Sequence, residues 1–330
     1  MPEGGRILFI TSNRLGDAVL STGVLDHLVG RYPGARFTVA CGPVAAPLFR
    51  ALPRLDRVIA IRKQPWAGHW LGLWRRCFGS WWRLVVDLRN SAVSRLLPAR
   101  RRVIASRLDE DCHRVEHLAR LFGLGAVPAP RLWFAEADRL AAQALIPDGG
   151  PVLALGPAAN WRGKTWRAEH FAEVAGLLTG PGGILAGARV AVLAAAGERE
   201  QAQPVLDAID PACRIDLVGR TDALVAGACL ARCVLFVGND SGLMHIAAAV
   251  GTPTLGLFGP SRPEHYAPWG AHCAVARTPI AYKDLVWGPG YDPKTVGTLM
   301  DSLSVEAVVE AAAALWARTR ISPGMSKEKV

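Results

Sequence analysis

Three stretches of this 330-residue sequence place charged or hydroxyl side chains beside glycine, a combination that suits the binding of a polar ligand. Asp17 follows Gly16 in SNRLGDAV, directly after a short apolar run. Lys164 lies in NWRGKTW, and the triplet Asp240–Gly242 follows the apolar run VLFVG. A carboxylate can take a proton from a hydroxyl, and a lysine can hold a diphosphate as a point charge. These stretches are therefore the first candidates for a reaction centre.

The Asp240–Gly242 triplet stands where an apolar strand gives way to a segment of helical character, 242–250. A helix N-terminus offers unpaired backbone N–H groups and the positive end of the helix dipole, which favour a phosphate. Asp240 could accept ligand hydroxyls, or Asp240 or Ser241 could simply cap the helix. Asp17 has the same two interpretations, and the residues alone leave both open.

Several better-known motifs are absent. The stretch GPAANWRGKTW has its first glycine, Gly156, two positions too early for a phosphate-binding P-loop. HRVEH, 113–117, has zinc-ligand spacing but no supporting third ligand, so we expect no metal site. No glycine fingerprint of a dinucleotide enzyme follows a strand. The seven scattered cysteines form no CxxC pair, which favours reduced thiols and a cytoplasmic protein.

Alternating strands and helices must position these residues. Apolar runs predict one series of strands at 6–11, 36–41, 57–61, 84–88 and 102–106, and a second at 151–156, 188–194, 214–219, 234–238 and 254–259. Helical spacing predicts helices at 20–32, 168–179, 198–209, 222–231, 242–250 and 305–319. Such alternation indicates an α/β protein with two doubly wound parallel-sheet domains, 1–148 and 149–320, followed by a flexible tail, 321–330. The sequence leaves open whether the final helix packs back on the first domain.

The net charge of +10 is concentrated in residues 1–150, which carry 22 Lys and Arg against 12 Asp and Glu. This asymmetry predicts an anionic partner: a phosphorylated substrate, a membrane surface or nucleic acid. The segment 62–84 adds five of the eleven tryptophans and five cations. It is either a loop and helix packed on the first domain or an interfacial element that lies on anionic lipid. No apolar stretch is long enough to span a membrane.

Combined in this order, three motifs resemble glycosyltransferase family 9, the ADP-heptose:lipopolysaccharide heptosyltransferases. They are RILFITSNRLGDAVLSTGVLDHL, GPAANWRGKTWRAEHFAEV and VGNDSGLMHIAAAVGTPTLGLFGPSRPEHYAPWG, and the resemblance covers nearly all of residues 6–310. It implies the GT-B architecture, in which two Rossmann-like domains face a central cleft. The N-terminal domain then takes the acceptor and the C-terminal domain the nucleotide sugar, and transfer inverts the anomeric centre without an essential metal or cofactor.

The resemblance also assigns roles to single residues. Asp17 matches the candidate general base, and Lys164 matches the lysine that holds the donor diphosphate. The remaining expected donor contacts are Asp240, Ser241, Gly242, either Glu198 or Glu200 at the ribose, and His245, for which packing is an equal alternative. The expected acceptor contacts, at strand ends in the basic half, are Arg14, Gly16, Arg89 and Asn90.

The predicted function is thus transfer of a sugar, by default heptose from ADP-heptose, to an anionic, lipid-linked saccharide of lipopolysaccharide core or a related glycan. The expected location is the cytoplasm, with peripheral contact to the cytoplasmic face of the inner membrane. Two alternatives are a nucleotide-sugar epimerase of the same architecture and a nucleic-acid-binding protein. The epimerase leaves the basic half unexplained, and no nucleic-acid-binding motif is present, so nucleic acid is not an expected partner.

Overall fold

The computed structural model describes residues 4–106, 111–286, 291–293 and 295–321. The chain divides into two compact units, Met1–Ala135 and Glu136–Val330. The sequence analysis placed this division after residue 148, whereas the helix before that point groups with the second unit. The flexible tail expected at 321–330 lies outside the described residues, apart from Ile321 at the end of the last helix.

The first unit contains a five-stranded parallel sheet with the strand order β3-β2-β1-β4-β5. The strands are β1 (Arg6–Ile10), β2 (Arg36–Cys41), β3 (Leu55–Ala60), β4 (Trp82–Asp87) and β5 (Ala99–Ile104). The three central strands are buried almost throughout, which is why they read as continuous apolar runs in the sequence. The order reverses between β1 and β4, and this switch point is where ligands bind in open parallel sheets.

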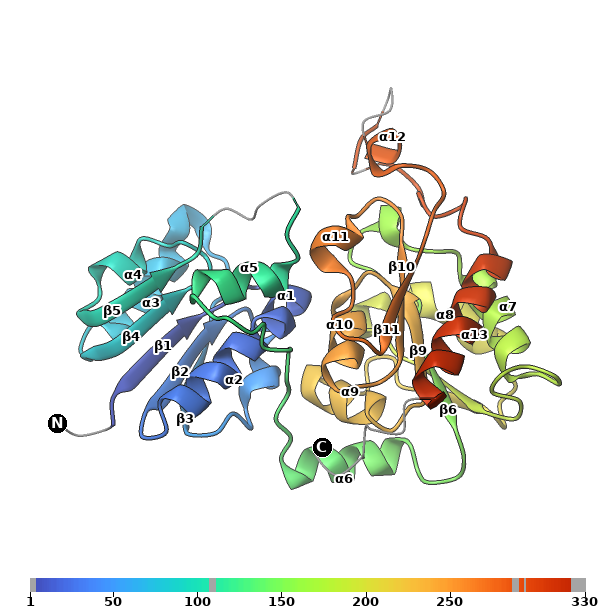
Figure 1. Cartoon of the computed structure of the whole chain (residues 1–330), viewed down its shortest axis with the longest axis horizontal. Coiled ribbons are helices and arrows are strands. Elements are labelled where there is room, and N and C mark those ends of the chain that lie inside the picture. Colours follow the sequence, from blue (N-terminus) through green and yellow to red (C-terminus); the bar gives the residue numbers. More distant parts are fainter. Residues whose placement is uncertain (1–3, 107–110, 287–290, 294, 322–330) are drawn as a thin grey trace. The chain divides into compact units, whose positions relative to one another are not determined.

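Helices cover both faces of this sheet, as Figure 1 shows. One face carries α3 and α4, which contact each other, and the other carries α1, α2 and α5. The bounds are α1 (Leu15–Leu20), α2 (Thr22–Arg31), η1 (Ala46–Phe49), η2 (Pro65–Ala67), α3 (Gly68–Cys77), α4 (Val93–Leu96) and α5 (Arg114–Leu121).

The second unit contains a six-stranded parallel sheet with the order β11-β10-β9-β6-β7-β8. Its strands are β6 (Val152–Gly156), β7 (Arg189–Val192), β8 (Arg214–Asp216), β9 (Leu235–Asn239), β10 (Thr254–Phe258) and β11 (Cys273–Arg277). This is the Rossmann order, and its switch point lies between β6 and β9. The sequence analysis missed β11, because this edge strand is only partly buried and lacks a long apolar run.

Helices also cover both faces of the second sheet, with α9 and α10 on one and α7, α8 and α13 on the other (Figure 1). The bounds are α6 (Glu136–Leu145), η3 (Arg162–Lys164), α7 (Ala168–Thr179), η4 (Ala196–Glu198), α8 (Arg199–Ala208), α9 (Ala223–Leu230), α10 (Gly242–Ala249), α11 (Pro263–Tyr266), α12 (Tyr282–Val286) and α13 (Val305–Ile321). The final helix α13 packs on α7, β10 and β11 of its own unit, and α6 packs on α9.

The tryptophan-rich segment 62–84 separates into an inner and an outer set of side chains. At helical spacing, the inner face of α3 packs on the core cluster that contains Leu8, Ile10 and Val85, through Trp70, Leu73, Trp74 and Cys77. Trp82 is fully buried at the start of β4, and its indole donates to the Cys77 carbonyl. Trp66 and Trp81, in contrast, are exposed. Three of the five tryptophans therefore build the core, which is the packing alternative, and two do not.

Candidate functional site

The switch point of the second sheet holds an ion pair between two of the predicted site residues. Lys164 follows β6 in the short helix η3, and Asp240 follows β9. The Lys164 Nζ donates to Asp240 Oδ2 at 2.5 Å. The aspartate side chain is 7% exposed and the lysine 24%, so the lysine is the partner that solvent or a ligand can reach. A cation held in this way at the carboxyl ends of parallel strands is suited to an anionic ligand.

Asn239, the last residue of β9, holds the two loops of this switch point together. Its side chain is fully buried. The Nδ2 donates to the Pro157 carbonyl at 2.7 Å, and the Oδ1 accepts from the Trp166 backbone N–H at 3.1 Å. One amide therefore ties both ends of the loop that carries Lys164, which fixes the lysine relative to Asp240.

Glycines at the ends of β6 and β9 make room for the Phe236 ring. A Cβ at Gly238 would stand 2.6 Å from a ring carbon of Phe236, and a Cβ at Gly156 would stand 2.7 Å from the same ring atom. Neither distance is tolerated for real side chains, so both positions require glycine. The ring thus packs against both strand ends.

The start of α10 has the features of an anion site. Ser241 stands at the N-cap position, but its side chain makes no capping hydrogen bond, and its buried Oγ has no hydrogen-bond partner within the described part of the chain. Asp240 bonds to Lys164 instead of capping the helix. Simple capping, the open alternative for both residues, is therefore not what these side chains do. Gly242 begins the helix, and His245 follows within its first turn, 4% exposed.

The two glutamates expected near the ribose differ in what they do. Glu198 ends η4 after β7, and its Oε2 accepts from the Ala195 backbone N–H at 2.9 Å, so its carboxylate closes the local turn. Glu200 is exposed in the first turn of α8. Both lie at the end of β7, beside the switch point in the strand order.

The switch point of the first sheet is bridged by different groups. Arg89 follows β4, and its Nη1 donates to the Oδ1 of Asn13, which follows β1, at 2.7 Å. The guanidinium also stacks over the Trp70 ring, 4.9 Å from its centroid. Burial lowers the pKa of Arg89, and the neighbouring Asp87 carboxylate works in the opposite direction. The Arg89 side chain is thus held across the switch point by Asn13 and Trp70.

Asp87, the last residue of β4, organises the loop that carries Arg89. It is fully buried and accepts three hydrogen bonds: from the Arg89 N–H at 2.9 Å, the Ser91 N–H at 2.8 Å and the Ser91 hydroxyl at 2.6 Å. Asn90 lies between them in the left-handed region, with φ of 52°, and its Oδ1 accepts from Arg95 at 2.8 Å. The Asn90 amide oxygen is therefore engaged within its own loop.

Asp17 lies in the first turn of α1, directly after the β1 loop. It is half-buried, and Ser12 Oγ donates to its Oδ2 at 3.3 Å while accepting from the Arg14 N–H at 3.1 Å. Gly16 precedes Asp17 in the helix, and the Arg14 side chain is exposed.

Sequence reasoning missed four residues that shape these sites: Asn13, Gly42, Asp87 and Asn239. A Cβ at Gly42 would stand 2.6 Å from the Asn13 Cα, so this glycine lets the loop after β2 pack against the loop after β1. Asp87 and Asn239 each end an apolar strand with a polar residue, LVVD and LFVGN. A buried polar group needs hydrogen-bond partners, so a polar residue at the end of an apolar strand indicates a residue that organises the following loop.

Asp17, Arg89 and their neighbours gather at the end of the first sheet, and Lys164, Asp240, Ser241 and Gly242 at the end of the second. Within the described ranges, no group of three or more His, Cys, Asp or Glu side chains is arranged to hold a metal ion.

The comparisons with known proteins identify the family of this chain. The model of glycosyltransferase family 9 (heptosyltransferase) matches residues 100–285, more than half of the chain. The chain belongs to this family. It is therefore a glycosyltransferase, and its two Rossmann-like units are those of the GT-B architecture, as the motifs predicted.

Individual relatives extend the match beyond the family model. Lipopolysaccharide heptosyltransferase 2 of Salmonella typhimurium is 27% identical over 320 residues, which is 84% of this chain and 89% of that protein. The crystal structure of a family 9 glycosyltransferase from Veillonella parvula superposes with a TM-score of 0.77 at 21% identity, covering 96% of this chain and 99% of that one. The E. coli ADP-heptose heptosyltransferase II structure gives 0.73 at 22%, covering 96% and 99%.

Proposed function

We propose that this enzyme transfers heptose from ADP-heptose to a saccharide of lipopolysaccharide core, with inversion at the anomeric carbon. The observation that carries the proposal is the Lys164–Asp240 pair at the second switch point, next to the N-terminus of α10. The names of the relatives, which are lipopolysaccharide and ADP-heptose heptosyltransferases, support the choice of donor and acceptor.

In this proposal the second unit binds the donor through its diphosphate. The bond between the sugar C1 and the phosphate oxygen breaks, and negative charge accumulates on the leaving diphosphate. Lys164 meets this charge, while Asp240 keeps its ammonium in place. The backbone N–H groups that begin at Gly242 and the Ser241 hydroxyl, which lacks a partner in the described structure, supply further donors.

The first unit binds the acceptor and provides the base. Asp17 takes the proton of the acceptor hydroxyl as its oxygen forms a bond to the sugar C1. Ser12 orients the carboxylate, and Arg89, held by Asn13 and Trp70, offers a cation for an anionic acceptor group. Arg14 lies exposed beside them as a further cation, and the backbone at Gly16 precedes the base.

The charge on the leaving group is balanced by protein groups in this scheme, so no metal ion or cofactor is required. We expect transfer to continue at an unchanged rate in excess EDTA. A loss of activity that Mg²⁺ or Mn²⁺ restores would contradict this part of the proposal.

The direct test is incubation with ADP-heptose and lipopolysaccharide core acceptors that lack heptose, followed by mass spectrometry of the acceptor. We expect a mass increase of one heptose with ADP-heptose and none with UDP-, GDP- or CDP-sugars. Epimerisation of the nucleotide sugar without any acceptor would instead support the epimerase alternative. Salt-dependent binding to DNA without affinity for nucleotide sugars would support the nucleic-acid alternative.

We further propose that the outer side of the segment 62–84 docks on an anionic lipid surface, where a lipid-linked acceptor resides. No helix in the described part of the chain has the length and apolarity of a membrane span, so contact would be peripheral. We define the docking face by its exposed apolar side chains and the cations between them: Trp66, Leu71, Phe78, Trp81, Arg62, Lys63, Arg75 and Arg76.

Charge and geometry favour a membrane as the occupant of the docking face. Trp66 is fully exposed on a left-handed turn, with φ of 53°, and Trp81 is 69% exposed. The sequence contains no Asp or Glu between Arg57 and Val86. Aromatic rings at headgroup depth among cations are the expected pattern of a protein that lies on anionic lipid.

Sedimentation with vesicles tests the docking face. We expect binding to vesicles that contain phosphatidylglycerol, weak binding to pure phosphatidylcholine, and a loss of binding in the double variant Trp66→Ala and Trp81→Ala. Leu140→Ala, which removes an exposed apolar side chain from α6, is the control. Equal binding of the double variant and the control would remove the docking face from the proposal.

A further inference from the structure

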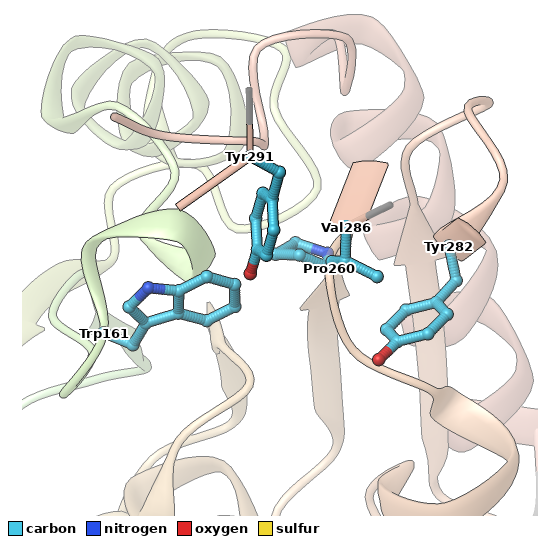
Figure 2. A pocket seen from close by; sticks show the side chains of 5 residues that line it. All are labelled: Trp161, Pro260, Tyr282, Val286 and Tyr291. Carbon is cyan, nitrogen blue, oxygen red and sulfur yellow. The ribbon is translucent and has the colours of Figure 1, made fainter. Parts of the chain in front are cut away.

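The second unit contains a pocket that none of the predicted site residues lines. Its volume is about 350 Å³, and its walls are Trp161, Pro260, Tyr282, Val286 and Tyr291. Figure 2 shows the aromatic rings of Trp161 and Tyr291 close together, with Pro260 behind them and Tyr282 on the opposite side. All five side chains are uncharged, and three are aromatic, so the pocket is apolar with two phenolic hydroxyls at its walls.

Trp161 is fixed in this wall by the loop that carries Lys164. A Cβ at Gly163 would stand 2.6 Å from the indole ring, so the ring lies directly on this glycine. The indole N–H donates to the Pro293 carbonyl at 2.8 Å, and the Trp161 carbonyl accepts from the Lys164 N–H at 3.0 Å. The indole of Trp161, three residues before Lys164, is therefore held by a hydrogen bond and by packing on Gly163.

The opposite wall comes from segments that follow β10 and β11. Pro260 is buried two residues after β10 and gives a rigid surface. Tyr282 begins α12, and the Arg262 guanidinium stacks over its ring at 5.1 Å from the centroid. This cation–π contact orients the tyrosine without placing its own charge among the lining residues.

The strand order gives the position of the pocket relative to the ion pair. Reading along the sheet edge, Pro260 follows β10, Asp240 follows β9, the Trp161–Lys164 loop follows β6, and the Glu198 turn follows β7. If the nucleoside lies toward β7, as the candidate ribose residues require, the pocket extends from the β6 loop of Lys164 toward β11, away from the nucleoside. That is the side of the sugar.

We propose that this pocket is a subsite for a pyranose ring of the saccharide substrates. Aromatic faces pack against the apolar C–H face of a sugar, while hydroxyl groups around the rim satisfy its polar edge. The volume suits a single sugar unit at the lower end of ligand pockets. The inference rests on the proposed function, since that function places a diphosphate at Lys164. The ring belongs either to the donor's transferred sugar or to the acceptor, and the experiment separates these sources.

The test compares Tyr282→Ala and Trp161→Phe with the unchanged enzyme in three measurements: the Kd of ADP, the Kd of ADP-heptose and the KM of the saccharide acceptor. A donor-sugar subsite raises the Kd of ADP-heptose about five- to tenfold in Tyr282→Ala, where an aromatic contact is lost, and less in Trp161→Phe, where it is only reduced; the Kd of ADP stays unchanged. An acceptor subsite raises only the acceptor KM by a similar factor.

Tyr32→Ala is the matched control, because Tyr32 in the first unit is also half-buried beneath arginine side chains. We expect it to change none of the three quantities. Unchanged ADP affinity in the pocket variants also shows that the unit remains folded.

Two outcomes would overturn the inference. If the variants raise the Kd of ADP and the Kd of ADP-heptose equally, the pocket binds the nucleobase. If they change none of the three quantities, the pocket binds no part of either substrate. Both differ from failure of the proposed function, in which the unchanged enzyme binds neither ADP nor ADP-heptose.

Discussion

The two switch points of this enzyme share one construction and differ in charge. In both sheets a central strand at the switch point ends in a fully buried polar residue, Asp87 in β4 and Asn239 in β9, which holds neighbouring loop segments in place. The first switch point is then bridged by an arginine that binds the neutral side chain of Asn13. The second is bridged by the ion pair of Lys164 and Asp240.

The difference follows from what each unit is proposed to do. A lysine paired with a buried aspartate is held in position but is neutralised, and it becomes an anion site when a diphosphate approaches its exposed side. The first switch point keeps its half-buried carboxylate, Asp17, with only a serine as a hydrogen-bond partner in the described structure. In the proposed scheme that carboxylate accepts a proton, and the same scaffold would then support a base in one unit and a leaving-group site in the other.

The largest expected effect is that of Asp17→Asn. We expect the transfer rate to fall about 10²–10⁴-fold, because the amide cannot take the acceptor proton. The Kd of ADP-heptose should stay unchanged in a calorimetric titration. The control is Asp26→Asn. It removes a carboxylate of α2 that pairs with Arg131, and the variant should transfer heptose normally. Normal transfer by Asp17→Asn would contradict the assignment of Asp17 as the general base.

The next effect is that of Lys164→Ala. Loss of a charged hydrogen bond costs about 1.5–3 kcal/mol, so we expect the Kd of ADP to rise about 10- to 150-fold in a calorimetric titration. Arg162→Ala removes an exposed cation from the same turn and should change the Kd less than twofold. If both variants raise the Kd of ADP equally, then the overall charge of the turn, and not Lys164 in particular, binds the diphosphate.

Exchanging the two buried strand-end residues tests the shared construction. Asp87 has only donors around it, whereas Asn239 both donates and accepts. Asp87→Asn directs an amide N–H₂ at donors, and Asn239→Asp directs a carboxylate at the Pro157 carbonyl. Each should lower the free energy of unfolding by about 1–3 kcal/mol, measured by urea denaturation. Gln143→Ala, at an exposed position of α6, serves as a neutral reference.

The smallest effect is expected from Arg89→Lys. Lysine keeps the charge but loses the planar stack on Trp70 and the fixed bond to Asn13. We expect the KM of an anionic acceptor to rise about two- to fivefold, which corresponds to a cation–π contact of about 0.5–1 kcal/mol. The Kd of ADP should not change, and a change there would show that the two switch points are not independent.

The sequence predicted the strands around both switch points and the family because buried parallel strands are continuous apolar runs and the motifs lie at their ends. It predicted less at the margins of the sheets. The edge strand β11 is only partly buried, and its apolar run, CAVA, is short. The tryptophans of 62–84 looked alike as residue types, yet Trp82 is fully buried and Trp66 fully exposed. Their burial differs because Trp82 lies in β4 and Trp66 lies in a left-handed turn, and residue type alone does not predict these positions.

By itself, the sequence determined which residues can do chemistry and on which strand ends they stand. Hydrophobic patterning fixes strand ends locally, within a few residues of Asp17, Lys164 and Asp240. Only the tertiary structure decided which of them meet. Lys164 and Asp240 are joined across 76 residues, as are Asn13 and Arg89. Trp161, Pro260 and Tyr282 line one pocket because β6, β10 and β11 all end at the same edge of one sheet. Such neighbours are set by strand order, which results from packing the whole sheet and leaves no mark in any one segment.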